Sequence, residues 1–510
     1  MSGTVRSASE LRADVTYHCD LVVVGTGAGG GMLIADAARA GLSVIAVEEG
    51  AYRTAKDFNQ REREMLSALF QDQGGRATVD GGVAVLQGRG VGGSTIHNTN
   101  LCKRAPDPIL EHWASEYGLD GWRPAEMAAD FAAVEERLHV SPIEPERVNR
   151  NNDVLLRGMK ALGWRGGLLH HNRRGCVGSG FCELGCAFDA KDNVTRALLP
   201  DALAAGANIW SDCRAERVLT DGKRAIGIEA RALRDGRPGP RMILFGGAVA
   251  LAGSAIGSAA LGLRSGLPDP HRLVGRSLHL HPGAAVAGLF DEPIEGWMGI
   301  PQSVECTEHI DFIPSSPRRV WIVPAFAHPI GFAAMAPGFG AAHMRRMRSY
   351  PFTAVLVAML HDHSAGQVEV ERDGRPKITY ALDGDDGRAL AGGMAACARL
   401  LLAAGAREVT VPIARGGGVR SEADLAAVAA HVPRALDPAL TSAHPMSTLP
   451  MAADPRRGVT DGDGRWHGLA GLWVADGSLF PTSIGGPPQI SIYTVGRRVA
   501  RAVIAELGKR

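Results

Sequence analysis

One glycine-rich turn constrains the fold of this chain more than any other feature. The apolar run Cys19–Val24 leads directly into Gly25-Thr26-Gly27-Ala28-Gly29-Gly30, and a helix-like stretch follows through Arg39. A second apolar run, Ser43–Val47, then ends in Glu48-Glu49-Gly50. This order predicts a strand, a tight turn, a helix and a second strand, which is the repeating unit of a Rossmann-like α/β fold.

The spacing of the glycines predicts a dinucleotide site. In Gly25-x-Gly27-x-x-Gly30 the first glycine permits the tight turn, the second lets a phosphate approach the backbone, and the third lets the helix pack closely on the strand. The helix, beginning near Ala28, then directs its N-terminus at the pyrophosphate. Glu48 stands where an acid accepts hydrogen bonds from the adenosine ribose, which disfavours a 2′-phosphate. This unit alone leaves both FAD and NAD open.

Length and charge narrow the class of protein. A chain of 510 residues is long for one compact domain, so we expect at least two. With 55 Lys and Arg against 54 Asp and Glu, the net charge of +1 disfavours nucleic acid and other polyanionic partners. Residues 1–20 lack the apolar run of a secretion signal, and no stretch reaches the length of a membrane span. We therefore expect a cytoplasmic protein without membrane insertion.

Several further segments carry a resemblance to a known family. Residues 88–98 read Gly-Arg-Gly-Val-Gly-Gly-Ser-Thr-Ile-His-Asn, and residues 443–448 read Ala-His-Pro-Met-Ser-Thr. Together with the stretches 249–263, 275–278 and 472–481, and in the same order, they resemble the glucose-methanol-choline (GMC) oxidoreductase family of FAD enzymes. Residues 180–191 further resemble the bacterial branch related to long-chain alcohol oxidases and FAD-linked sugar dehydrogenases.

The resemblance implies an α/β fold with two domains. A Rossmann-like FAD-binding domain is expected from residues 1–105, 190–288 and 441–510, and a substrate-binding or cap domain built on an antiparallel sheet from residues 106–189 and 289–440. The alternating runs Val368–Glu371 and Ile378–Tyr380 are typical of antiparallel strands and are expected in that second sheet.

The resemblance also implies which residues contact the cofactor, FAD. Beyond the dinucleotide turn, the expected contacts are Gly92, Gly93, Ser94, Asn98, Asp476, Gly477 and Gln489. Asp476 is expected at the ribityl chain and Gln489 at the pyrimidine side of the flavin. His97, beside Asn98, is interpreted as a packing residue rather than a flavin contact.

The expected reaction is the oxidation of an alcohol by hydride transfer to flavin N5. His444 matches the family's general base, and imidazole suits that task near neutral pH. Pro487 stands where the family places a His or Asn donor, and proline offers none. A non-redox or light-driven flavoenzyme of the lyase or decarboxylase type therefore stays open. The expected partners are a hydroxylated lipophilic or sugar-like small molecule, and O₂ or an external electron acceptor.

Two clusters of side chains allow alternative interpretations. Cys176, Cys182 and Cys186 could supply thiolates to an iron–sulfur cluster, or could be reduced thiols packing between the domains. Ser179 stands where a cluster site would have another cysteine, so we predict no metal. The basic run of Arg345, Arg346 and Arg348 reads as a solvated face rather than a carboxylate clamp.

Overall fold

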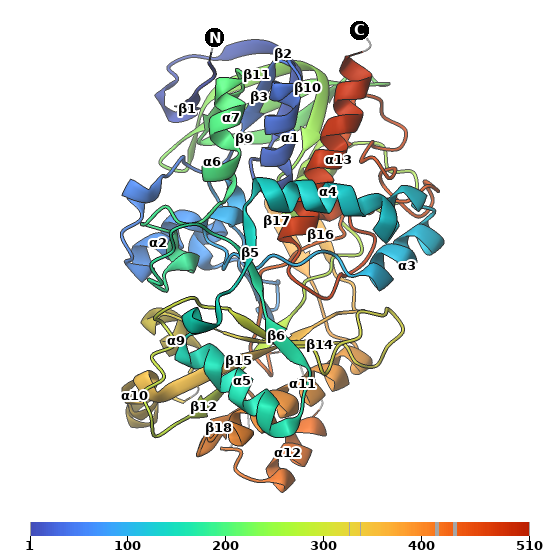
Figure 1. Cartoon of the computed structure of the whole chain (residues 1–510). Coiled ribbons are helices and arrows are strands. Elements are labelled where there is room, and N and C mark those ends of the chain that lie inside the picture. Colours follow the sequence, from blue (N-terminus) through green and yellow to red (C-terminus); the bar gives the residue numbers. More distant parts are fainter. Residues whose placement is uncertain (1, 326, 337, 414–417, 432–435, 509–510) are drawn as a thin grey trace.

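Two sheets, one above the other, organise the computed structural model, which describes residues 2–325, 327–336, 338–413, 418–431 and 436–508 (Figure 1). The upper sheet has the order β1-β8-β3-β2-β11-β10-β9, and β20 pairs with β11. Its strands are β1 (Val5–Ser7), β2 (Val15–Val24), β3 (Val44–Val47), β8 (Asn208–Ser211), β9 (Cys213–Thr220), β10 (Ala225–Arg234), β11 (Arg237–Leu251) and β20 (Leu472–Val474). Neighbouring strands among β1, β8, β3, β2 and β11 pair in parallel, and so do β11 and β20. The pairs β11–β10 and β10–β9 are antiparallel.

Burial on both faces explains why the central strands of this sheet are continuously apolar. All four residues of β3 are buried, as are Leu21, Val22 and Val23 of β2. Helices α1 (Ala28–Arg39) and α13 (Gln489–Leu507) pack against each other beside β2 and β11, as Figure 1 shows. The predicted strand, turn, helix and strand are thus confirmed, and β2 begins four residues earlier than the apolar run.

The lower sheet has the order β4-β19-β12-β15-β14-β13-β6, and β18 pairs with β12. Its strands are β4 (Val83–Val85), β6 (Gly166–Leu168), β12 (Gly283–Leu289), β13 (Val304–Cys306), β14 (Val320–Pro324), β15 (Thr353–Leu360), β18 (Glu408–Thr410) and β19 (Leu440–Ser442). Helices α5 (Arg150–Leu162) and α11 (Gly384–Ala403) pack on this sheet, and α12 (Glu422–Ala429) packs on α11. The predicted fold class, a parallel-sheet domain with a second, mainly antiparallel sheet, is confirmed.

The placement of two strands differs from the prediction. The runs around Val368 and Ile378 form strands β16 (Gln367–Val370) and β17 (Pro376–Thr379), which pair with each other and not with the lower sheet. They pack against α8 (Ser254–Ser265), which belongs to a segment expected in the FAD-binding domain. A short turn joins them, so their hydrogen bonds are satisfied locally and the alternating pattern could not reveal which sheet they join.

The domain boundaries stay a prediction, but two packing relations bear on them. Helix α4 (Pro124–Arg137), which belongs to a segment expected in the cap domain, packs on α13, and Arg501 forms an ion pair with Asp130 at 2.5 Å. In α3 (Asp107–Tyr117) the Trp113 indole N–H donates to Thr482 Oγ1 at 2.8 Å. The residues from about 106 to 137 therefore lie with the upper sheet.

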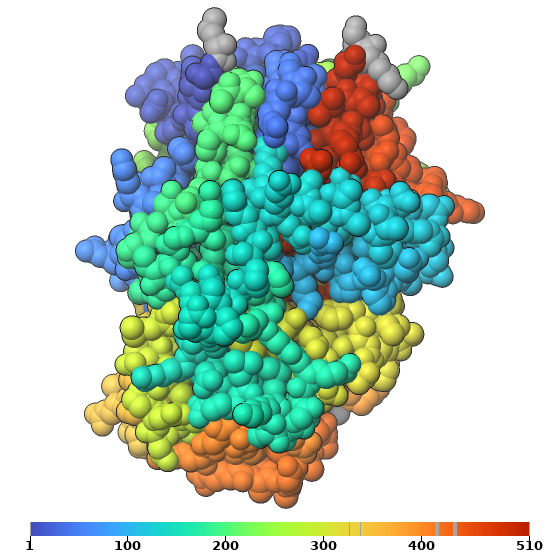
Figure 2. All heavy atoms as spheres, in the orientation of Figure 1, coloured from blue at the N-terminus to red at the C-terminus, as the bar shows by residue number. Residues whose placement is uncertain are grey.

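A short helical segment covers one side of the space between the sheets. It contains α9 (Pro329–Met335) and α10 (Gly340–Arg348), followed by the single turn Tyr350–Phe352. Its attachment to the upper half is through α2 (Glu62–Leu69), because the Glu62 carboxylate accepts from the backbone N–H groups of Ile330 and Gly331, each at 2.7 Å. Figure 2 shows this yellow-to-gold segment at the edge of the lower half. We refer to residues 327–352 as the cap segment.

Candidate active site

A cavity of about 1440 Å³ lies between the two sheets. It exceeds the usual volume of a small-molecule site, roughly 300–1,000 Å³, so there is room for a large cofactor and a substrate. Most of the predicted site residues line it: Gly25, Gly27, Ala28, Glu48, Gly93, Ser94, Asn98, His444, Asp476, Gly477 and Gln489. Gly30 and Gly92 lie in the same two turns but behind the cavity wall.

The three glycines of the dinucleotide turn have different structural roles. Gly25 has φ +97°, and a Cβ there would lie 2.3 Å from the carbonyl oxygen of Ala252. A Cβ on Gly30 would lie 2.2 Å from the carbonyl oxygen of Gly25, so both positions require glycine for the fold itself. Gly27 differs, because the nearest atom to a Cβ there is Gly93 Cα at 3.9 Å. Gly27 thus borders open space that a phosphate group can fill.

The second glycine turn packs directly against the first. Gly93 has φ +54°, and a Cβ there would lie 2.8 Å from Gly27 Cα, so the turns can approach this closely only with glycine. The backbone N–H of Gly92 donates to Thr26 Oγ1 at 3.1 Å. Two turns that are distant in the sequence therefore form one backbone-lined cradle, which fits the pyrophosphate of FAD.

Glu48, at the end of β3, links the two turns. Its buried carboxylate accepts from Thr26 Oγ1 at 2.9 Å, from Gly50 N at 3.1 Å and from Gly90 N at 3.3 Å. Burial raises the pKa of Glu48, and the hydrogen bonds from Gly50 and Thr26 partly oppose this. The carboxylate lines the cavity, where the ribose contact is expected, and that contact stays a prediction.

The predicted flavin contacts at the other end form a hydrogen-bonded chain. Asn98 Nδ2 donates to Gln489 Oε1 at 2.7 Å, and Gln489 Nε2 donates to the Leu101 carbonyl at 2.6 Å. The fully buried Lys191 ammonium donates to the carbonyls of Ile96 and Asn98, and so fixes the loop that carries Asn98. These contacts hold both amides in place on the cavity wall.

Asp476 is held by its own neighbours at the N-terminus of a short helical turn. Its carboxylate accepts from Ser258 Oγ at 2.6 Å and from the backbone N–H of Ser478 at 2.9 Å. Burial raises the pKa of Asp476, against the opposing effect of the Ser258 and Ser478 hydrogen bonds. Asp476 lines the cavity, as its predicted contact with the ribityl chain requires.

His444 lies against a second histidine, His281. The two Nδ1 atoms are 3.3 Å apart, and the rings are nearly perpendicular, at 89°. The backbone N–H of Gly485 donates to His281 Nε2 at 2.9 Å, so the neutral His281 ring carries its hydrogen on Nδ1 and donates to His444 Nδ1. Burial lowers the pKa of His444 to about 4, so this ring is neutral at pH 7.

This arrangement determines which nitrogen of His444 carries the hydrogen. Because His444 Nδ1 accepts from His281, the hydrogen of the neutral ring lies on Nε2. Among the described residues, none accepts a hydrogen bond from that Nε2, and His444 lines the cavity. The resting ring therefore offers a donor to a ligand. A base at Nε2 requires the other tautomer, in which His281 accepts at Nδ1 and its Nε2–H opposes the Gly485 N–H.

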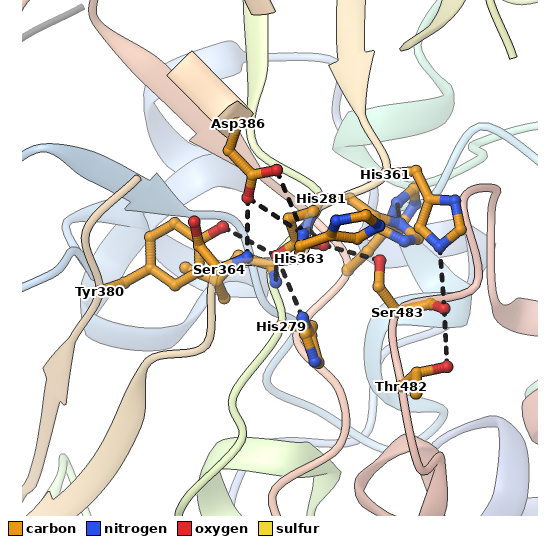
Figure 3. Close-up of polar contacts among 12 residues, drawn as sticks. His279, His281, His361, His363, Ser364, Tyr380, Asp386, Thr482 and Ser483 are labelled. Carbon is orange, nitrogen blue, oxygen red and sulfur yellow. Dashed lines mark hydrogen bonds and ion pairs between the residues drawn. The ribbon is translucent and has the colours of Figure 1, made fainter. Parts of the chain in front are cut away.

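The buried carboxylate of Asp362 organises the surroundings of His281. It accepts from the backbone N–H of Leu280 at 2.9 Å, from Tyr380 Oη at 2.8 Å and from Ser483 Oγ at 2.7 Å. Figure 3 labels two of these partners, Tyr380 and Ser483, near His281. Although burial would raise the pKa of Asp362, the nearby His279 holds it below its usual value. His281 itself has φ +49°, an uncommon conformation for a residue other than glycine, which these contacts hold in place.

His281 and Asp362 were not predicted as site residues. The available signal was a repeated pattern, His279-Leu280-His281 and His361-Asp362-His363, which the fold places at the ends of neighbouring strands β12 and β15. Pro487 lines the cavity without a donor, as expected. The segment before it contributes a backbone group, the Gly485 N–H, to His281 instead of a side chain to the cavity.

The cavity continues along the lower sheet as an apolar channel. In β12 and β15 alternate residues face it, which follows from the period of two in a strand. These residues are Gly283, Ala285, Ala287 and Leu289 of β12 and Thr353, Val355, Val357 and Met359 of β15. Seven residues of β12 span roughly 20 Å, so the channel extends far from His444.

The three clustered cysteines lie away from this cavity, around a much smaller one of about 20 Å³. All three are free, and burial raises the pKa of Cys182 to about 12, so it is a thiol at neutral pH. Within the part of the chain that the structure describes, no group of three or more His, Cys, Asp or Glu side chains is placed to hold a metal ion. That no metal binds here stays a prediction.

Comparison with known proteins decides the family. The N-terminal and C-terminal models of the GMC oxidoreductases match residues 66–283 and 362–496. The chain belongs to the GMC oxidoreductase family. An uncharacterised GMC-type oxidoreductase of Mycobacterium tuberculosis is 35% identical over 495 residues, which cover 96% of this chain and 76% of the relative. A long-chain-alcohol oxidase of Arabidopsis thaliana is 29% identical over 525 residues, covering 96% and 68%.

Solved structures share the fold. A pyridoxine 4-oxidase from Mesorbium loti superposes with a TM-score of 0.75 at 18% identity, over 95% of this chain and 99% of that one. A formate oxidase of Aspergillus oryzae gives 0.72 at 15%, over 96% and 98%. These comparisons confirm the predicted family and its cofactor, FAD. The protein is therefore an oxidoreductase that acts on a small molecule. None of its described helices combines the length and apolarity needed to cross a membrane.

Proposed function

We propose that this GMC oxidoreductase oxidises a lipophilic primary alcohol, with His444 as the group that meets the hydroxyl. The observation that carries the proposal is the His444 Nε2, free of any described partner, on a cavity that continues as an apolar channel along β12 and β15. The apolar wall formed by β12 and β15 favours a lipophilic substrate over a sugar-like one, because a sugar would leave its hydroxyls without partners along that wall.

Different residues of the chain have different roles in the proposed reaction. When bound, FAD supplies the acceptor for the hydride that leaves the carbinol carbon. The hydroxyl proton passes to His444 Nε2, which requires the tautomer with hydrogen on Nδ1 and hence a rearranged His281–Gly485 contact. Asn98 and Gln489 hold each other at the flavin end, and the product is the aldehyde. O₂ or an external acceptor would be the final oxidant.

One observation favours a second candidate function. In the resting tautomer His444 donates, and Pro487 adds no second polar group to the cavity. A site with a donor and without a ready base also suits a substrate oxyanion, as in a non-redox or light-driven lyase or decarboxylase. Dependence of turnover on illumination, with the flavin staying oxidised, would favour this second function.

A chain-length series tests the proposed substrate class. Rates of flavin reduction are measured anaerobically with primary alcohols from short to long chains, in the enzyme and in Ala285→Phe. The new ring would fill the channel partway along β12, so reduction by long alcohols should fall at least tenfold while short alcohols react as before. Ala429→Phe, on the exposed side of α12, is the matched control. Equal losses for all chain lengths would count against a channel along β12.

A further inference from the structure

The cap segment carries a concentration of exposed apolar side chains. Phe339 is 91% exposed, Met344 53% and Ile330 48%, and Met335 and Phe352 are also exposed. Single exposed apolar residues are ordinary on a protein surface, but five within 23 residues form a patch that needs an explanation. Neither α9 nor α10 contains a buried residue, so these short helices present much of their apolar surface to solvent.

Charge in the same segment has one sign. Residues 327–352 contain no Asp or Glu, whereas the end of α10 carries Arg345, Arg346 and Arg348. Arg345 and Arg348 are exposed. The carboxylate of Glu62, which lies beside α9, is engaged by the backbone N–H groups of Ile330 and Gly331. The net charge of +1 for the whole chain conceals this local basic and apolar surface.

The patch adjoins the cavity. Several cap residues line the cavity from the inside, among them Phe332, Met335, Arg345 and Ser349. Met335 is exposed as well, so the cavity wall and the patch meet at this side chain. Besides the Glu62 bonds, contacts at both ends hold the segment: the His328 ring stacks on Phe181, the Tyr350 ring stacks on Trp297, and the Pro351 and Phe352 carbonyls accept from backbone N–H groups of residues 290–295.

We propose that the cap segment docks on an anionic lipid surface, so that substrate passes from the bilayer into the cavity. Exposed aromatic and aliphatic side chains enter the headgroup region, and neighbouring arginines are attracted by anionic lipid. The passage of substrate from the bilayer rests on the proposed function, whereas the docking does not. A second copy of the chain fits less well, because a symmetric contact would bring the two arginine runs together without any acid between them.

Vesicle binding of the holoenzyme tests the docking without any substrate. Co-sedimentation is measured with phosphatidylcholine vesicles and with vesicles containing 30% phosphatidylglycerol, at about 0.1 M and about 1 M salt, where screening is weak and strong. We expect binding to the anionic vesicles at low salt, at least tenfold weaker binding to phosphatidylcholine, and release at high salt.

Three variants separate the contributions of charge and of apolar contact to vesicle binding. The triple exchange R345Q/R346Q/R348Q should weaken binding to anionic vesicles at least twentyfold, since each of the exposed Arg345 and Arg348 contributes about a factor of five. Phe339→Ser should weaken binding several-fold on both vesicle types. The matched control R217Q/R237Q/R241Q removes three exposed arginines from strands β9 and β11 and should bind as the unchanged enzyme does. Flavin absorbance shows that each variant retains its cofactor.

Three outcomes would overturn the proposal. The first is an enzyme that sediments with neither vesicle type, and the second is equal weakening by the cap and control triple variants. The third is a concentration-dependent dimer that requires Phe339 and forms without lipid binding, which would identify a second copy as the occupant. Because none of these readouts uses an alcohol, a failed alcohol assay would count only against the proposed function.

Discussion

The two ends of the cavity differ in the groups that form their walls. At the end expected to hold the dinucleotide the wall is mainly backbone: a Cβ on Gly93 would lie 2.8 Å from Gly27 Cα, whereas a Cβ on Gly27 would have no protein atom closer than 3.9 Å. At the reaction end the wall is side chains, and His281, His444 and Asp362 come from segments separated by 163 and 82 residues at their contacts. The difference predicts that substitutions at one end eliminate cofactor binding, whereas substitutions at the other slow the reaction and leave FAD in place.

The largest effect is expected at Gly27. A valine side chain there would meet no protein atom closer than 3.9 Å at its Cβ, so the fold should persist, but the chain would occupy the space expected for the pyrophosphate. Gly27→Val should therefore purify folded and almost free of FAD. Flavin absorbance against protein concentration measures this, with circular dichroism for the fold.

Gly392→Val is the matched control for that exchange. Gly392 is exposed in α11, with nothing within 4 Å of a Cβ, and should keep full FAD occupancy. A Gly27→Val protein that retained its flavin would show that the cradle is not the pyrophosphate site, and the comparison of the two ends would fail.

A second, smaller effect is expected at His444. Removing a general base typically costs about a hundredfold to ten-thousandfold in rate, so flavin reduction by alcohol should slow by this factor in His444→Ala while FAD stays bound. Rapid mixing under anaerobic conditions measures the rate. His271→Ala, an exposed histidine outside the cavity lining, should react normally. An unchanged rate in His444→Ala would remove this residue from the reaction.

A third prediction concerns Asp362, which positions the histidines without lining the cavity. Asp362→Asn keeps the shape but replaces one carboxylate oxygen by an amide NH₂, which opposes a backbone donor on whichever side it lies, either the Leu280 N–H or the His281 N–H. We expect a loss of about 1–3 kcal/mol in the free energy of unfolding, and a reduction rate roughly tenfold lower, with FAD retained. Thermal unfolding and rapid mixing measure the two effects. Asp235→Asn, in the exposed turn between β10 and β11 and outside the cavity lining, should change neither, and a similar loss there would show that the effect is not specific.

A fourth prediction concerns the pH dependence of stability. Burial lowers the pKa of His361 to about 4 and those of His97 and His171 to about 3, below the unfolded value of about 6.5. Between these values the unfolded chain binds more protons than the native protein, so stability should fall as the pH is lowered from 6.5 toward 4. Thermal unfolding measures this, and His361→Gln should make the dependence shallower. An identical slope in that variant would contradict the assignment.

The sequence predicted the two ends unequally for a physical reason. The glycine turn, the strands around it and Glu48 are close in the chain, so local geometry alone specifies them and a dinucleotide site could be predicted. FAD itself was implied only by the family resemblance of other segments. His281 and Asp362 become partners only when β12 and β15 pair, and Gly485 reaches His281 from another segment 204 residues away. The tautomer of His444 depends on all of these contacts and had no signature in the sequence. The cap segment was recognised only as a run of arginines, because its exposed apolar residues depend on how α9 and α10 pack.

The central claim, that this oxidoreductase takes hydride from an alcohol at the His444 end of the cavity, is tested most directly by one anaerobic mixing experiment in the dark. Holoenzyme is mixed with a long-chain primary alcohol while the flavin spectrum and the substrate are followed together. The account predicts bleaching of the oxidised flavin band in step with the formation of one aldehyde per flavin. Consumption of a substrate while the flavin stays oxidised, or the absence of bleaching across all chain lengths, would contradict it.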